Sequence, residues 1–572
     1  MEKADSVFIN GKVVTADKDF SFKKAIAVKD GWIIDVGENS DIKPYIGSGT
    51  RIMDLKGKVI LPGAHDAHSH GVVFGANHLC CDCSFPKVKT IGDLQAMLAE
   101  KARELPPGKW IRGNGINSDN IEECRNHPGR GLSRRDLDAV TPDHPVILVL
   151  WSGHGVLVNT RALEICGIQP TTKDPESGVI ERDEHGVPTG VFLESSAINL
   201  ISQHVPLWTD EELRSFILEY QRILNEQGYT SYTESTLGPG GNERDSGASG
   251  ERNIHIYKQL YDEGLLTARV SIGVYTGYQG IQSYESMLHD LDTMKLPKDM
   301  DPNWLKISML KIFCDGVHLG HTAWMMEDYY DQPGYHGRSM FPGDTDEEQE
   351  EELHKMIMLA HQRGYQVAAH AIGDRSVKAV IDGYIKAKQA YPSRNLRHYV
   401  IHADSFATNE MAQKAARYKI PFSVQPGLAD YLFEPSLDCV GPRASRMFGL
   451  REFLQYGVVL AGGSDSLNGE YCNWRKALQS AVTRRSAITG RVYSPELAIS
   501  VEEGIRLFTC NGAYQENCEQ VRGSIEIGKV ADFQVLDQDI FQVDPEEISS
   551  VGVEMTMAGG KVVYCRNSQI EL

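Results

Sequence analysis

The middle of the chain carries eight short apolar runs with amphipathic segments between them. Buried strands that alternate with amphipathic helices are typical of βα units, which build a parallel sheet. Eight such units close a (β/α)8 barrel. The sequence therefore predicts an α/β fold with a TIM-type barrel at its centre. In chain order, the eight predicted strands lie in the runs VILPGAH, TSYTES, ARVSIGVY, LKISMLKIF, YQVAAH, RHYVIH, PFSVQP and GVVLAGGSD.

The two ends of the chain differ from the middle in their pattern of apolar and polar residues. Residues 1–60 and 515–572 contain short β-branched stretches that alternate apolar with polar residues and are broken by Gly-containing turns. Neither end alone has enough strands to cover a hydrophobic face. We therefore expect both ends to form one discontinuous β-sandwich, with residues 61–514 forming the barrel.

The interval from about residue 72 to 205 is too long for one crossover between the first two predicted strands. Its strand-and-turn texture appears in KWIRGNGINSD, PVILVLWSGHGVLVN and GVPTGVFLE. These features predict an inserted α/β subdomain.

Charge and composition limit the kinds of molecule that the protein is expected to bind. The chain has 58 Lys and Arg against 78 Asp and Glu, and its net charge of -20 disfavours nucleic acid and anionic membrane surfaces. The sequence shows no secretory signal and no long apolar stretch. Its 11 cysteines, including Cys80, Cys81 and Cys83, are typical of reduced, buried thiols in a cytoplasmic protein. We expect a small-molecule substrate, and a homodimer stays open.

Side chains that can bind metal follow five of the predicted strands, at the end of a barrel where active sites lie. Each has an alternative interpretation: a strand-end His can be structural, Lys311 can pair with Asp315, and Asp465 can cap a helix. Their joint placement favours a metal site. In chain order, the predicted ligands are His68 and His70 after the first strand, Lys311 on the fourth, His370 and His402 ending the fifth and sixth, and Asp465 after the eighth.

The segment VILPGAHDAHSH resembles the metal-binding opening of the amidohydrolase superfamily, and the order of the six ligands resembles its binuclear layout. Further phrases resemble the amidohydrolase 3 group, which includes YtcJ-like proteins and N-substituted formamide deformylases. The resemblance covers nearly the whole chain. The phrases are SGHGVLVNTRAL, GVPTGVFLE, LKIFCDG, AHAIGDRSV, SVQPGL, GGSDS and GSIEIGKVADFQVLD.

The resemblance implies one or two divalent metal ions, with zinc favoured and manganese or iron as alternatives. His68 and His70 would bind the more buried ion together with Asp465. The two later histidines, His370 and His402, would bind the more exposed ion. Lys311, carbamylated by CO₂, would bridge the two ions, because an ammonium cannot ligate a metal. With Lys311 unmodified, a single-metal site becomes the alternative.

The resemblance also implies a reaction. A metal-activated hydroxide would hydrolyse a non-peptide C–N bond in an N-acyl amide, cyclic amide or formamide, with Asp465 as the general base. We expect Asp66 and Asp374, close in sequence to the ligands, to orient them, although a turn or cap role is an equal alternative. Two other functions stay open: an esterase or lactonase on the same centre, and a non-catalytic regulatory protein on this scaffold.

Substrate contacts are predicted from positions near the ligands. His154 resembles a family position that faces the metal site from the insertion. Aromatic walls are predicted from Trp324 and Tyr431, for which simple packing is the alternative. The predicted substrate-binding residues are His154, His65, His318, His321 and Trp324.

Overall fold

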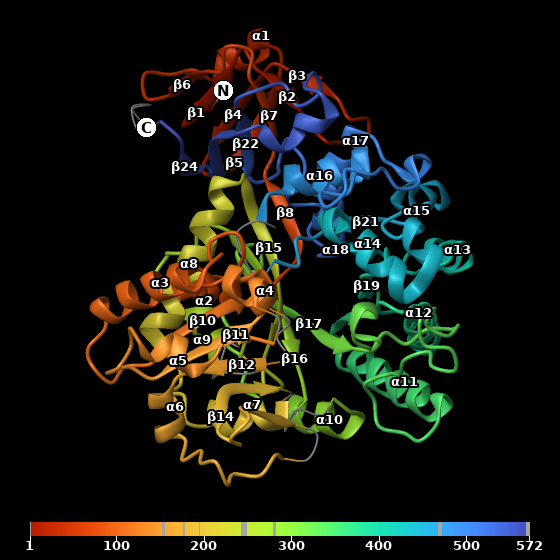
Figure 1. Ribbon diagram of the computed structural model, residues 1–572. Helices are drawn as coiled ribbons and strands as arrows, with labels where there is room; N and C mark the ends of the chain where they lie inside the picture. Colours follow the sequence, from red (N-terminus) through yellow and green to blue (C-terminus); the bar gives the residue numbers. More distant parts are fainter. Residues whose placement is uncertain are drawn as a thin grey trace. The chain divides into compact units, whose positions relative to one another are not determined.

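The computed structural model describes residues 2–127, 129–151, 155–175, 178–193, 195–241, 249–277, 282–466 and 472–567. It contains an eight-stranded parallel sheet, in the order β21-β20-β19-β18-β17-β16-β15-β8. Several of these strands, including β8, β15 and β17, are labelled in Figure 1. Each predicted run overlaps one of these strands, and the predicted fold class is confirmed. The strands are β8 (Ala64–Ser69), β15 (Tyr229–Leu237), β16 (Arg269–Tyr275), β17 (Leu305–Phe313), β18 (Gln366–His370), β19 (Tyr399–Ile401), β20 (Phe422–Val424) and β21 (Leu460–Gly462).

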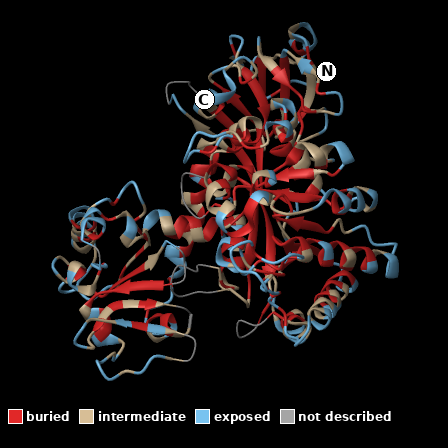
Figure 2. Cartoon of the chain, turned by 45° about the vertical axis from the view of Figure 1, so that its right-hand side comes forward, coloured by how far each residue is buried: buried red, intermediate tan, exposed pale blue. Residues whose placement is uncertain are grey.

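The barrel strands are buried along nearly their whole length (Figure 2). A hydrogen bond of 2.8 Å from the Asp465 amide to the His68 carbonyl joins the two ends of the sheet and nearly closes the barrel. Helices separate successive strands along the chain. They include α8 (Asp210–Glu226), α9 (Arg252–Asp262), α10 (Tyr284–Thr293), α11 (Asp346–Arg363), α12 (Asp374–Ala390), α13 (Asn409–Tyr418), α14 (Ala429–Val440), α15 (Leu450–Tyr456), α16 (Trp474–Thr483), α17 (Val501–Leu507) and α18 (Cys510–Gln515).

Helix α11 illustrates why these segments are helical. The Thr345 side chain accepts a hydrogen bond from the Glu348 amide in a capping box, which satisfies a free donor of the first turn. The helix ends at Gly364, whose φ of 85° places it in the left-handed conformation that favours glycine. Leu353, Met356 and Ile357 are buried and share one face of the helix, which is the face turned toward the protein interior.

The first predicted strand is divided in two at Gly63. The chain before it forms β7 (Val59–Pro62), which belongs to a different sheet from β8. A Cβ atom on Gly63 would lie 2.1 Å from Thr230 Oγ1. The change of sheet therefore occurs where the backbone passes too close to β15 for any side chain, a constraint that the apolar run alone does not reveal.

Strands from both chain ends form sheets outside the barrel. Strand β22 (Phe533–Leu536) pairs with β7, which also pairs with β2 (Lys12–Val14). Their core contains Phe8 and Phe533, whose ring centroids lie 4.8 Å apart. The predicted limits at residues 60 and 515 stay predictions. The other strands are β1 (Ser6–Ile9), β3 (Phe22–Lys23), β4 (Ala25–Lys29), β5 (Trp32–Gly37), β6 (Arg51–Asp54), β23 (Val553–Ala558) and β24 (Lys561–Cys565).

The chain divides into two compact units, and the second comprises Val72–Ile217 and Asn242–Asn253. The limits predicted for the insertion, about residues 72 and 205, stay predictions. Cys81, Cys83 and Cys124 lie in the hydrophobic core of the second unit, and burial raises the pKa of each thiol. Its six-stranded sheet contains β13 (Val179–Arg182), β14 (Pro188–Leu193), β12 (Gly155–Val158), β11 (Val146–Leu150), β10 (Ile111–Ile116) and β9 (Cys81–Asp82), in that order.

No helix in the described part of the chain combines the length and the apolar character that crossing a membrane requires.

A buried ion pair joins the barrel to the sheets formed by the chain ends. Arg269 on β16 donates two hydrogen bonds to the Asp532 carboxylate, at 2.7 and 2.9 Å. The carboxylate also accepts from the Gly559 amide at 2.7 Å. Both charged side chains are almost fully buried, so each depends on the other for compensation of its charge.

Replacing Arg269 with Met should lower the free energy of unfolding by about 3–5 kcal/mol, because Asp532 would be left buried without its cation. Urea unfolding followed by circular dichroism measures the change. Lys355→Ala, which removes an exposed ion pair with Glu351, is the control and should leave the midpoint unchanged. An Arg269→Met protein as stable as the wild type would contradict the role of this pair.

Candidate metal centre

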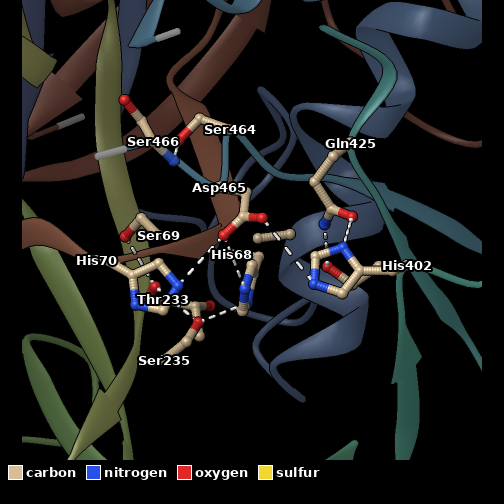
Figure 3. Close-up of polar contacts among 12 residues, drawn as sticks. His68, Ser69, His70, Thr233, Ser235, His402, Gln425, Ser464, Asp465 and Ser466 are labelled. Carbon is tan, nitrogen blue, oxygen red and sulfur yellow. Dashed lines mark hydrogen bonds and ion pairs between the residues drawn. The ribbon is translucent and has the colours of Figure 1, made fainter. Parts of the chain in front are cut away.

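Two histidines from the end of β8 face one carboxylate. His68 lies on the strand and His70 follows it. The Asp465 Oδ1 atom lies 3.3 Å from His68 Nε2 and 3.2 Å from His70 Nε2 (Figure 3). One ligand atom from each residue lies within 4.8 Å of those of the other two. This separation suits three ligands around one metal ion.

The other predicted ligands adjoin this group. His402 Nε2 lies 3.9 Å from Asp465 Oδ2, and the His402 ring centroid lies 5.3 Å from that of His68. The His370 ring is 4.6 Å from the His402 ring, centroid to centroid. Lys311 is fully buried, and its charge acts on both His68 and His370. The structure thus brings all six predicted side chains together.

Within the residues that the structure describes, no contact supports the structural alternatives for Lys311 and Asp465. Asp315, the considered partner of Lys311, accepts backbone hydrogen bonds from Trp324 and Gly373 at 2.9 and 2.8 Å. Helix α16 takes Asn473 as its N-cap, whose side chain accepts from the Arg475 amide. The Asp465 carboxylate faces the histidines instead.

Two of the six residues hold unusual backbone conformations. His402 has a φ of 68° and Asp465 a φ of 50°. Both values lie in the left-handed region, which few residues other than glycine and asparagine occupy. Such conformations cost about 1–3 kcal/mol each and concentrate at functional sites. Hydrogen bonds hold both in place: His402 N donates to Ser423 O at 3.0 Å, and Asp465 N donates to His68 O.

Burial sets the protonation of these groups. It lowers the pKa of His402 to about 4 and the pKa values of His68 and His370 well below the usual range. Neutral imidazoles offer a lone pair, as metal binding requires. Burial acts against ionisation of Asp465, but the adjacent His68 and His70 hold the pKa of its carboxyl well below the usual value.

Second hydrogen bonds orient two of the imidazoles. His68 Nδ1 lies 2.7 Å from Ser235 Oγ, and His402 Nδ1 lies 2.7 Å from Gln425 Oε1 (Figure 3). An amide oxygen only accepts, so His402 carries its proton on Nδ1 and presents the Nε2 lone pair to the site. Sequence reasoning missed Ser235 and Gln425 in these roles, although both lie in the strand-end phrases TSYTES and SVQPGL.

Asp66 acts on the backbone of the site. Its carboxylate accepts from the His68 amide at 3.2 Å, the Ser464 amide at 2.8 Å and the Ser464 hydroxyl at 2.6 Å. These bonds tie β8 to the segment that carries Asp465. Asp374 instead accepts from the amides of Met326 and Arg375, at 2.7 and 3.0 Å, and so fixes a loop.

Of the predicted substrate-binding residues, His154 lies outside the described residues. The others make hydrogen bonds within the protein. His65 Nδ1 lies 2.8 Å from Ser231 Oγ, and the ring packs against Gly512 of α18. Burial lowers the pKa of His65 to about 3. His65 is therefore a neutral, packed histidine on the first barrel strand.

The three candidates after β17 are also held by other groups. His318 is buried, with Nε2 2.6 Å from Ser436 Oγ. His321 lies 2.9 Å from both carboxylate oxygens of Asp331. Trp324 is fully buried and donates its indole N–H to Asp346 at 3.2 Å. Tyr431 accepts a hydrogen bond from Lys476 at 2.8 Å. Their roles toward a substrate stay predictions.

In the part of the chain that the structure describes, the site has buried polar atoms without a hydrogen-bond partner, of which the His370 nitrogen is a metal donor. Within the described residues, Lys311 Nζ and His370 Nε2 are buried without a hydrogen-bond partner. Buried polar atoms rarely stay unpaired in proteins. Imidazole nitrogens and a carboxylate also form the donor set that zinc and related ions prefer. The residues present therefore fit a divalent metal.

A parallel barrel with histidines and a carboxylate at its strand ends defines the class of metal-dependent barrel hydrolases. An uncharacterized metal-dependent hydrolase from Pyrococcus furiosus shares the fold, with a TM-score of 0.72 at 22% identity over 94% of this chain and 100% of that one.

Sequence comparison defines the family more closely. The model of the amidohydrolase family matches residues 51–564. The amidohydrolase YtcJ of Bacillus subtilis is 30% identical over 98% of this chain and 99% of its own. N-substituted formamide deformylase of Arthrobacter pascens is 27% identical over 98% of both chains. The chain belongs to the amidohydrolase family, whose members are metal-dependent hydrolases, and the resemblance seen in its sequence is confirmed.

Replacing His70 with Ala should weaken binding of a divalent metal by at least about tenfold, because one imidazole ligand is removed. Competition with a chromogenic chelator measures the affinity, and elemental analysis after dialysis measures the metal content. His321→Ala is the matched control, because His321 pairs with Asp331, and it should bind metal as the wild type does. Unchanged affinity in His70→Ala would contradict the site.

Proposed function

We propose that the protein hydrolyses a non-peptide C–N bond, in an N-acyl amide, a cyclic amide or a formamide. The observation that carries the proposal is the Asp465 carboxylate, held 3.2 to 3.9 Å from the Nε2 atoms of His68, His70 and His402. The similarity to N-substituted formamide deformylase over 98% of both chains supports the bond type.

His68, His70 and Asp465 would hold one divalent ion, and His370 and His402 a second. Zinc is the metal proposed, with manganese and iron as alternatives. A bound ion supplies Lewis acidity, polarising the substrate carbonyl and lowering the pKa of water from about 15.7 toward ~7.

Lys311 is suited to carbamylation. Burial lowers the pKa of its amine to about 7, so much of it is neutral at neutral pH. The neutral nitrogen attacks CO₂, a C–N bond forms, and one proton is released. The resulting carbamate is an anion with two oxygens, which would bridge the two metal positions. It would also give the unpaired Nζ atom a functional role.

Asp465 is the proposed general base. Its low pKa keeps the carboxylate ionised at neutral pH, ready to take a proton from the attacking water. The water oxygen then forms a bond to the carbonyl carbon, and the C–N bond breaks. Asp465 returns the proton to the leaving nitrogen. Asp66 and Ser464 hold the backbone at this point, so the carboxylate keeps its orientation.

Two alternatives remain testable. The same centre could cleave an ester or a lactone, because the nucleophile is identical. A regulatory role is suggested by the exoenzymes regulatory protein AepA of Pectobacterium carotovorum, which is 23% identical over 72% of this chain. The six assembled side chains favour catalysis over that role. The charge of -20 supports a small-molecule substrate rather than nucleic acid, and we propose a cytoplasmic location.

Replacing Asp465 with Asn should lower kcat by about 10²–10⁴, the usual contribution of a general base. Initial rates on a panel of amides, formamides and matched esters, with release of amine or acid as the signal, measure it. Metal content is determined in parallel, because the amide side chain of the variant keeps one oxygen ligand. Full turnover by Asp465→Asn would exclude the base, and hydrolysis of esters alone would exclude the C–N proposal.

Carbamylation of Lys311 should increase as the pH rises from about 6 to 8, because deprotonation of an amine with a pKa of about 7 exposes the reactive lone pair. Carbon-13 NMR with labelled bicarbonate detects the carbamate carbon. Lys311→Met should lack this signal, whereas Lys306→Met should keep it. A signal that persists in Lys311→Met would place the carbamate elsewhere.

A further inference from the structure

Two aromatic side chains share the face of the barrel that carries the metal-site residues. Phe313 ends β17, two residues after Lys311, and alternation along a strand places both on one side. In the parallel ladder, Phe313 is level with His370, and Tyr275 is level with Lys311. Lateral neighbours in a sheet also project to the same face. Tyr275 and Phe313 therefore lie beside the predicted ligands.

Distances confirm that these side chains touch the site. The Phe313 ring lies 5.3 Å from the His370 ring, and Lys311 Nζ lies 4.6 Å from the Phe313 centroid. Tyr275 meets Phe313 edge to face, with centroids 5.1 Å apart. We call this pair, Tyr275 and Phe313, the aromatic wall.

The aromatic wall differs from the barrel core in its exposure. Met309, Leu310 and Ile312 on the same strand are fully buried, whereas Tyr275 and Phe313 are only partly buried. Both rings therefore keep some exposed surface beside the predicted ligands, which a ligand at the strand ends can cover. Trp324, for which the sequence predicts a contact with the substrate, is instead fully buried and has no exposed surface.

The chemistry of the wall selects a class of ligand. Phe313 presents an apolar ring, and burial raises the pKa of Tyr275, so its phenol stays neutral. An anionic substituent would lose hydration here without gaining an opposite charge from either ring. An aromatic ring on the ligand would make an edge-to-face or offset contact with the wall. A saturated ring of similar size makes such a contact less well.

We propose that the aromatic wall, Tyr275 and Phe313, is a substrate-binding surface that selects amides carrying a planar aromatic group next to the scissile bond. This inference rests on the proposed function and deepens it. Phe313 contacts both His370 and Lys311, so a ring bound on the wall would lie beside the proposed metal site. The contact contributes to binding, and thus to KM, before any proton moves.

The test compares N-benzylacetamide with N-(cyclohexylmethyl)acetamide, two amides in which a methylene group separates the ring from the nitrogen, so that they differ mainly in the planarity of the ring. The wild type should favour N-benzylacetamide about tenfold in kcat/KM. Phe313→Leu keeps an apolar side chain but removes the aromatic face, so this preference should fall to about one, mainly through a higher KM for N-benzylacetamide. Phe22→Leu, at an exposed position of β3, is the control and should keep the preference.

A second measurement does not depend on turnover. Isothermal titration with phenylacetone and cyclohexylacetone, ketones that have no leaving nitrogen, should show tighter binding of phenylacetone to the wild type and equal binding to Phe313→Leu. Metal content is measured in each variant, so that loss of the site is recognised.

The outcomes separate the two proposals. Equal hydrolysis of both amides by the metal-loaded wild type would overturn the aromatic wall and leave amide hydrolysis standing. A preference that survives in Phe313→Leu would also overturn the wall. Discrimination between the ketones without hydrolysis of any amide would support the wall and overturn the proposed C–N hydrolysis.

Discussion

The hydrogen bonds of the Asp66 carboxylate are the interaction on which the site depends. They join the amide of His68 on the first barrel strand to the amide and hydroxyl of Ser464 after the last. A barrel brings its first and last strands together only if something holds that seam, and here the seam also sets the distance from His68 to Asp465. Closure of the fold and assembly of the metal centre are therefore the same event.

The site concentrates features that are unfavourable in a protein without a ligand. His402 and Asp465 have positive φ angles, and buried nitrogens of Lys311 and His370 have no hydrogen-bond partner in the described structure. Each feature costs free energy that the surrounding barrel must offset. A divalent ion would satisfy the His370 nitrogen and the Asp465 carboxylate, and a carbamate on Lys311 would account for the other nitrogen.

Much of this was predictable from the sequence, because the strongest signals were local. Apolar runs with amphipathic segments between them predicted the eight barrel strands, and the placement of six metal-binding side chains on five of those strands predicted one metal site. The break at Gly63 was missed because it depends on a close approach to Thr230, far away in sequence. Ser235 and Gln425 were missed for a similar reason: a polar residue at a strand end shows its partner only when the neighbouring strand is in register.

Binding of a divalent metal by His68, His70 and Asp465 at the end of the barrel is the centre of the proposed chemistry. Crystals of the metal-loaded protein, measured on both sides of the zinc absorption edge, test it directly. We predict an anomalous peak within coordination distance of the Nε2 atoms of His68 and His70 and of the Asp465 carboxylate, about 2.0–2.2 Å from each. Metal bound only at other positions, with no peak among these three side chains, would contradict it.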